Sequence, residues 1–232
     1  MRIERFYGHS VMVDGLNASS TVLDLGANYG NFALAIVNRF NCKPFCVEPD
    51  PDLYKILASN PALSAFNLAV TTRAGPARYY VAENSECSSL IHPVICKTTD
   101  EIECQGVTLE DLLTTIGIQN IDVLKVDIEG LELELLTSLQ ASILSCVDQL
   151  SVEFHESVGL GTAKQVQQTI DYLRGYGFEA VRGSFFDYSD VLFLHEERLH
   201  LPPHWRWLAK RERIRNGVSR RLGRSSRKRS SD

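Results

Sequence analysis

The chain has 232 residues, of which 44% are hydrophobic and 23% are charged, as in soluble globular proteins. No stretch is long and apolar enough to span a bilayer, and the start MRIERF lacks the hydrophobic segment of a secretory signal, so we expect a cytoplasmic protein. The six cysteines form no C-x-x-C pair and no second cluster at zinc spacing, which favours reduced, partly buried thiols.

The charge is unevenly distributed along the chain. Residues 205–232 carry eleven Lys or Arg against two acidic residues, a net +9, whereas residues 1–204 carry 13 against 27, a net −14. An acidic body does not look like a nucleic-acid-binding surface, while a basic tail can meet an anionic partner.

The basic tail has an apolar ridge formed by Leu208, Ile214, Val218 and Leu222. In a basic amphipathic helix, this ridge can lie on an anionic membrane surface through residues 205–229, with the tryptophans at the interface. The alternatives are a frayed helix followed by a solvated, disordered tail, or a segment that binds RNA.

Residues 21–30, TVLDLGANYG, predict a buried strand that turns sharply into a helix. Gly26 and Gly30 allow the tight turn and let a ligand approach the backbone, because neither has a Cβ. Such a turn at the end of a first strand is where open α/β sheets bind nucleotide-like ligands, although a packing role needs similar residues. Asn28 stands where the dinucleotide fingerprint has its middle glycine, which disfavours NAD.

A second strand is expected at 44–48, where it ends in Glu48 and a proline. Glu48 lies 24 positions after Asp24, a spacing at which a carboxylate can accept hydrogen bonds from ribose hydroxyls. The alternative is a solvated loop acid. A helix at 50–60 and a third strand at 65–70 should follow.

A strand is expected at 77–81, followed by a polar, irregular stretch at 83–105 that we expect to form a loop over the site, with disorder as the alternative. The later elements alternate between helix and strand. They are a helix at 107–113 capped by Thr108, a strand at 121–127, a helix at 131–140, a strand at 149–155, a helix at 162–176, and two closing strands at 178–181 and 190–194. This order predicts an α/β fold with a mainly parallel, doubly wound sheet and a terminal antiparallel hairpin.

Three predicted strand ends, at 24–30, 127–130 and 153–155, should share one edge of this sheet, because the carboxyl ends of parallel strands lie together. The convergence would bring together Asp127, Glu129, Glu153 and His155. Each of them also has a structural explanation, such as a satisfied, partly buried histidine at 155.

Several motifs resemble, in order, those of FkbM-type methyltransferases over roughly residues 20–195. They are VLDLGANYG at 22–30, VEP at 47–49, NLAV at 67–70, SSL at 88–90, TL at 108–109, LKVDIEG at 124–130 and EFH at 153–155. The resemblance implies a Rossmann-like class I methyltransferase fold, S-adenosylmethionine as methyl donor and a hydroxyl group as acceptor. It divides the chain into a lead-in at 1–20, a methyltransferase domain at 21–200 and a basic tail at 201–232.

The residues expected to bind the cofactor are Asp24, Gly26, Ala27, Asn28, Gly30, Glu48 and Asn67. The glycine turn would shape the pocket for the methionine end, while Asp24 would orient the loop or meet the amino group through water. Glu48 would bind the ribose, and the region near Asn67 would border the adenine.

Methyl transfer from a sulfonium to an alcohol needs the two reactants in near-attack geometry and a positioned base for the hydroxyl proton. His155 is the first candidate base, with Asp127 or Glu153 to orient it. In the alternative, a divalent cation held by Asp127 with Glu129 or Glu153 lowers the pKa of the bound hydroxyl; this is possible but not favoured.

We therefore expect an O-methyltransferase that acts on a sugar or glycan hydroxyl, or else on a natural product. The alternatives are a nucleoside-binding partner module without turnover and a nucleic-acid methylase guided by the basic tail. Against the second, the chain lacks the Asn-Pro-Pro-Tyr or Asp-Pro-Pro-Tyr motif of amino-group nucleobase methylases.

Overall fold

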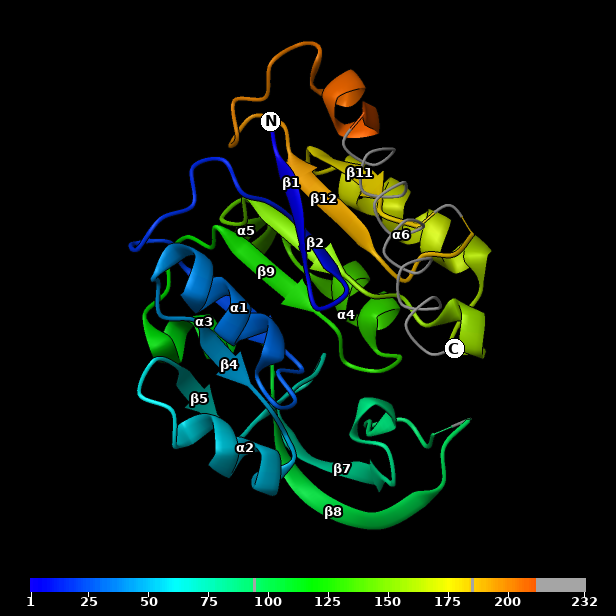
Figure 1. Ribbon diagram of the computed structural model, residues 1–232. Coiled ribbons are helices and arrows are strands. Elements are labelled where there is room, and N and C mark those ends of the chain that lie inside the picture. The colour runs from blue at the N-terminus through cyan, green and yellow to red at the C-terminus, as the bar shows by residue number, and fades with distance from the viewer. Residues whose placement is uncertain (94, 185, 212–232) are drawn as a thin grey trace, which may run out of the picture.

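A computed structural model of the protein describes residues 1–93, 95–184 and 186–211. Its central sheet has seven strands in the order β11-β12-β10-β9-β3-β4-β5 (Figure 1). The strands are β3 (Val22–Leu25), β4 (Phe45–Val47), β5 (Ser64–Phe66), β9 (Val123–Val126), β10 (Gln149–Val152), β11 (Phe178–Arg182) and β12 (Val191–His195).

Five neighbouring strands, β5, β4, β3, β9 and β10, run parallel, and β12 runs antiparallel to both β10 and β11. The chain builds outward from β3 to β5 and then returns to place β9 on the other side of β3. The predicted parallel sheet with an antiparallel closing hairpin is confirmed. The reversal of strand order between β3 and β9 is the point at which such sheets bind ligands.

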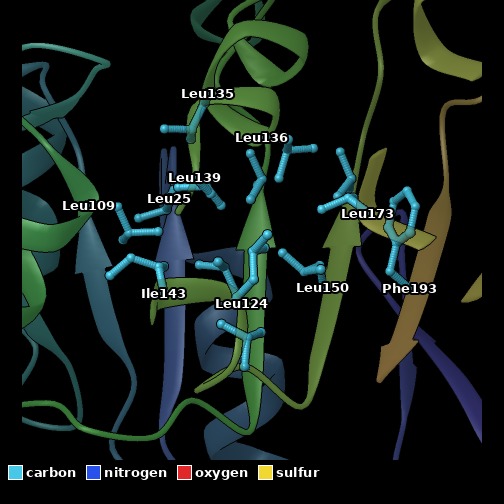
Figure 2. Close-up of a cluster of buried hydrophobic side chains, with 14 of the residues drawn as sticks. Leu25, Leu109, Leu124, Leu135, Leu136, Leu139, Ile143, Leu150, Leu173 and Phe193 are labelled. Carbon is cyan, nitrogen blue, oxygen red and sulfur yellow. The ribbon is translucent and has the colours of Figure 1, made fainter. Parts of the chain in front are cut away.

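Helices cover both faces of the sheet. They are α1 (Asn31–Phe40), α2 (Pro51–Ala58), α3 (Leu109–Ile116), α4 (Glu132–Ser138), α5 (Ala141–Leu144) and α6 (Ala163–Arg174). Alternate residues of the central strands point to opposite faces, so that Val22 and Val123 pack with α1 while Leu23 and Leu124 belong to the larger cluster with α3 to α6. Figure 2 shows leucines from this larger cluster between the strands and the covering helices.

The stretch predicted as irregular is partly a strand. β7 (Gly75–Ala82) and β8 (Thr98–Val107) form a long antiparallel ribbon, with β6 (Ala69–Val70) beside β8. The prediction of a loop is wrong for 98–105, which belongs to β8. The strand was not recognised because this stretch has no apolar run, and its side chains are at least partly exposed. The expected third strand at 65–70 is likewise split into β5 and β6.

The connection between β7 and β8 contains the short 3-10 helix η1 (Ser85–Cys87) and a disulfide between Cys87 and Cys96. The expectation that all six cysteines are free thiols is therefore wrong for this pair. The fold of the connection brings their Cα atoms to 6.2 Å, which the nine-residue sequence separation does not reveal.

An N-terminal hairpin, β1 (Ile3–Phe6) and β2 (His9–Met12), lies across β10 and β12 (Figure 1). From the sequence, this stretch was expected only as a lead-in at 1–20. The hairpin packs in a cluster with Leu192, Leu194, Trp205 and Ala209, so the first part of the expected tail belongs to the folded body.

Trp205 is 3% exposed and donates a hydrogen bond from Nε1 to Glu196 Oε1 at 2.8 Å. The prediction that both tryptophans face a membrane is therefore wrong for Trp205, whereas Trp207 is 60% exposed. Most of the predicted apolar ridge, from Ile214 onward, lies outside the described residues. Within the described ranges, no helix is long and apolar enough to cross a membrane.

Candidate active site

The turn after β3 packs directly against the end of β9. Gly26 has φ 74° and Gly30 has φ 78°, backbone conformations that glycine adopts without strain. The amides of Gly26 and Ala27 both donate to the carbonyl of Val47, and a Cβ at Gly26 would collide with the carbonyl oxygen of Asp127. The glycine is thus required by the close approach of two strand ends.

A cavity of about 460 Å³ opens at this turn, within the size range of small-molecule sites. Its lining includes Gly26, Ala27 and Asn28 from the turn, Val47, Glu48 and Pro49 after β4, and Leu68, Ala69 and Val70 after β5. The loop between β7 and β8 also contributes, as expected for part of the predicted 83–105 loop.

Asn67 does not line the cavity. Its Nδ2 donates to the carbonyls of Glu48 and Pro49, both at 2.9 Å, and so it holds the turn that carries Glu48. The neighbouring Leu68 reaches the cavity instead. The expected direct cofactor contact by Asn67 is corrected to a supporting role.

Glu48 lines the cavity although it is only 3% exposed. Its carboxylate accepts hydrogen bonds from the amides of Asn28 at 2.8 Å and Asp50 at 2.9 Å. Burial disfavours the charged form and raises the pKa of Glu48 to about 7, against the effect of these two hydrogen bonds. Glu48 thus connects the glycine turn with the end of β4.

Below the turn lies a buried cation, Lys125, which is 3% exposed. Its Nζ lies 2.9 Å from Asp24 Oδ1 and 3.4 Å from Asp127 Oδ2, and donates to the carbonyl of Gly26 at 2.8 Å. Burial works against the charge, but the two carboxylates prevail and raise the pKa of Lys125. Asp24 does not line the cavity, and its link to the turn runs through Lys125, which also donates to the carbonyl of Gly26.

Asp127 is the centre of the charged groups at the end of β9. Burial alone would raise its pKa, but Lys125 and His9 hold it well below its usual range. Asp127 is therefore ionised at neutral pH. His9 comes from the N-terminal hairpin, is 2% exposed, and places Nε2 3.3 Å from Asp127 Oδ2 and 3.9 Å from Glu153 Oε2.

His155 lies in a cage of carboxylates. Its Nε2 is 3.1 Å from Glu129 Oε2 and 3.8 Å from Asp127 Oδ1, and its Nδ1 is 3.3 Å from Glu132 Oε1. Burial opposes the charge, but Glu129 and Glu132 raise the pKa of His155 to about 11. The geometry therefore argues against the predicted base, because an imidazolium has no free lone pair at neutral pH.

Two glutamates hold this cage in place. Glu129 has φ 56°, a left-handed conformation that is costly for a residue with a Cβ, and its carbonyl accepts a hydrogen bond from Ser89 Oγ at 2.6 Å. Glu132 is 1% exposed and accepts from the amides of Ile128 and Gly130. No sequence motif pointed to Glu132, which lies within the helix expected at 131–140.

His155 should make stability depend on pH. Because its pKa is raised from 6.5 to about 11 in the fold, its charge stabilises the protein fully below pH 6.5, and this contribution declines as the pH rises toward 11. We expect His155→Gln to lower the free energy of unfolding most near pH 6 and least near pH 10. Urea unfolding across this range measures the difference, and a difference independent of pH would contradict the assignment.

Glu153 borders a second cavity of about 290 Å³, which shares Asn84, Glu86 and Glu129 with the first. Its side chain is 32% exposed. Burial, followed by repulsion from Asp127, raises the pKa of Glu153 to about 7. Glu153 therefore changes its protonation near neutral pH.

The set named for a divalent cation was Asp127, Glu129 and Glu153. The ligand atoms that lie within 4.8 Å of one another in the described residues belong instead to His9, Asp127 and Glu153, and to Asp127, Glu132 and His155. Glu129 belongs to neither group.

A family model, described as the methyltransferase FkbM domain, matches residues 24–180, more than half of the chain. The chain belongs to the FkbM methyltransferase family. The FkbM domain runs from β3 into β11, and therefore includes the glycine turn, Glu48 and the acidic cluster. The hairpin that carries His9 precedes it.

Among curated proteins, the chain is 28% identical to methyltransferase sdnD of Sordaria araneosa, over 68% of this chain and 74% of that protein. It is 24% identical to the hexuronic acid methyltransferase AglP of Haloferax volcanii, over 64% of this chain and 61% of AglP. It also matches AMB antimetabolite synthetase AmbE of Pseudomonas aeruginosa at 25% identity, spanning 71% of this chain but only 10% of AmbE.

Among solved structures, a TehB-like SAM-dependent methyltransferase from Corynebacterium glutamicum is 12% identical, with 77% of this chain and 79% of that chain covered. Its TM-score is 0.43. At that score the likeness carries no weight, and the Rossmann-like assignment of this FkbM protein rests on its own strand order.

Proposed function

We propose that the protein is an S-adenosylmethionine-dependent methyltransferase that methylates a hydroxyl group, on a sugar or glycan in the first place and on a natural product in the second. The observation that carries this proposal is the cavity at the switch point of the sheet, formed by the glycine turn and Glu48 within an FkbM domain. The name of AglP, a hexuronic acid methyltransferase, supports a sugar acceptor.

The residues around the first cavity fit S-adenosylmethionine. Backbone at Gly26 approaches the cavity without side-chain obstruction, Glu48 offers a carboxylate for ribose hydroxyls, and Leu68 and Val70 offer an apolar border for adenine. S-adenosylmethionine, when bound, supplies an electrophilic methyl group on a sulfonium sulfur. Asn28 in place of a middle glycine speaks against a dinucleotide.

Glu153 is the group best placed to take the proton from the acceptor hydroxyl. Glu153 borders the second cavity, which is next to the first cavity and can hold the acceptor. Its pKa of about 7 suits a general base. Burial, together with repulsion from the ionised Asp127, keeps the Glu153 pKa high. His155 stays charged and holds Glu129, so its role in this scheme is to order the site.

The cofactor assignment predicts that Glu48→Gln weakens S-adenosylmethionine binding about tenfold or more, because hydrogen bonds to a charged group contribute about 1.5–3 kcal/mol. Calorimetric titration at pH 8, where Glu48 is ionised, measures the affinity. Glu83→Gln is the matched control, because Glu83 lines the same cavity but is exposed.

Glu48→Gln should keep most of its thermal stability, since an amide oxygen can still accept from the Asn28 or Asp50 amide. Unchanged affinity in a folded Glu48→Gln variant would refute the ribose role.

A further inference from the structure

We propose that the methyl acceptor carries no negative charge near its reacting hydroxyl, and that it is an uncharged or amine-bearing polyol with an apolar substituent. The inference rests on the proposed function, and it concerns the second cavity. Two features of that cavity carry it: the balance of charge on its walls and the apolar side chains that line it beside the carboxylates.

The second cavity has more acids than bases. Glu86, Glu129 and Glu153 line it, and His155 is the single cationic side chain among the described residues of its wall. Both ring nitrogens of His155 already face carboxylates, Glu129 on one side and Glu132 on the other. The positive charge of His155 is therefore balanced by protein carboxylates and is not available to pair with an anionic acceptor.

The first cavity offers no cation either. Among the described residues that line it, the basic side chains are Lys125 and His9, and both already face protein groups. The Nζ of Lys125 is occupied by Asp24, Asp127 and the carbonyl of Gly26, and Nε2 of His9 faces Asp127 and Glu153. A carboxylate, sulfate or phosphate beside the reacting hydroxyl would meet a partly buried wall on which carboxylates outnumber basic side chains, and like charges repel there. A hydroxyl or an ammonium group would find hydrogen-bond acceptors instead.

Apolar side chains also line the second cavity. Ile91, Pro93 and Ile95 come from the loop between β7 and β8, and Val158 and Leu160 come from the segment after β10. The Cys87 to Cys96 disulfide closes the loop that carries the first three. Ile91 and Leu160 also line an adjoining groove of about 550 Å³, which gives room for an apolar substituent longer than the cavity itself.

This combination separates the chain from one of its relatives. AglP is named for a hexuronic acid, a sugar that carries a carboxylate at neutral pH. The acidic walls described above are poorly suited to such an acceptor. The acceptor of this protein should therefore have a sugar hydroxyl, like the hexuronic acid for which AglP is named, but no carboxylate.

Three probes that differ in charge test the proposal: hexyl β-D-glucopyranoside, hexyl β-D-glucuronide and the hexyl glycoside of glucosamine. The full-length protein is supplied with S-adenosylmethionine, and release of S-adenosylhomocysteine is measured for each probe. We expect kcat/KM for the neutral and amine probes to exceed that for the glucuronide about tenfold or more, a difference equivalent to 1.4 kcal/mol. The methyl glycosides, which lack the apolar chain, should be poorer acceptors than the hexyl glycosides.

Glu86→Lys places a cation in the cavity at an exposed position, and should narrow the preference against the glucuronide. Glu103→Lys on β8, which lines neither cavity, should leave the preference unchanged. Equal or faster turnover of the glucuronide, or turnover of none of the probes by protein that binds S-adenosylmethionine, would overturn the proposal. Failure to bind S-adenosylmethionine would instead refute the proposed function, because binding is measured separately by calorimetry.

Discussion

Lys125→Met should lower the free energy of unfolding by about 3–5 kcal/mol, the cost of removing one partner from a buried ion pair. Lys125 is 3% exposed, and its Nζ lies 2.9 Å from the fully buried Asp24. Methionine fills a similar volume but leaves Asp24 without its cation and leaves the Gly26 carbonyl without its donor. The glycine turn should therefore lose both stability and its affinity for S-adenosylmethionine.

Urea unfolding of Lys125→Met measures the loss. Lys55→Met is the matched control, because Lys55 pairs with Asp52 at 2.7 Å on the exposed surface of α2, and its removal should leave stability close to that of the unaltered protein. The double variant Asp24→Asn with Lys125→Met should recover much of the loss, since the buried charge is removed from both sides. If the free energy of unfolding fell no more in Lys125→Met than in Lys55→Met, the ion pair of Lys125 with Asp24 would not stabilise the turn.

Glu153→Gln should reduce methyl transfer about 10²- to 10⁴-fold, the range that a positioned general base contributes. Glutamine occupies the same space and cannot accept the hydroxyl proton. The affinity for S-adenosylmethionine should change by less than about twofold, because Glu153 lines the second cavity and not the first. Turnover with hexyl β-D-glucopyranoside and calorimetric titration with S-adenosylmethionine separate the two effects.

The pH profile identifies the role of Glu153. With a pKa of about 7, Glu153 is a base above that pH and protonated below it, so kcat/KM of the unaltered protein should fall on the acid side of pH 7. The residual activity of Glu153→Gln should lack this acid limb. Glu103→Gln serves as the charge control. Full turnover in Glu153→Gln would rule out Glu153 as the base.

Local patterns were sufficient to predict the centre of the fold. The apolar run before Asp24 and the glycines at 26 and 30 predicted a strand, a tight turn and a helix, and β3 and α1 lie there. Alternation of apolar strands and amphipathic helices then predicted a parallel sheet. Parallel pairing brings the ends of β9 and β10 together, which is why Asp127, Glu153 and His155 could be placed in one cluster.

What the sequence could not show depends on contacts between distant segments. His9 reaches the site because the N-terminal hairpin packs across β10 and β12. The residue pattern of a short hairpin does not predict such a contact. Lys125 is an ordinary member of a strand motif in the sequence, and its burial is offset by Asp24 and Asp127, which come together only in the fold. The role of His155 as a cation depended on Glu132, an acid on a helix that faces inward to bind backbone amides.

The central claim is that the glycine turn and Glu48 form a site for S-adenosylmethionine. Calorimetric titration of the purified full-length protein with S-adenosylmethionine and, in parallel, with NADH tests it most directly. Saturable binding of S-adenosylmethionine with no binding of NADH is the predicted result. Binding of NADH alone, or of neither compound, would mean that the turn serves packing or another ligand, and would contradict the proposed function.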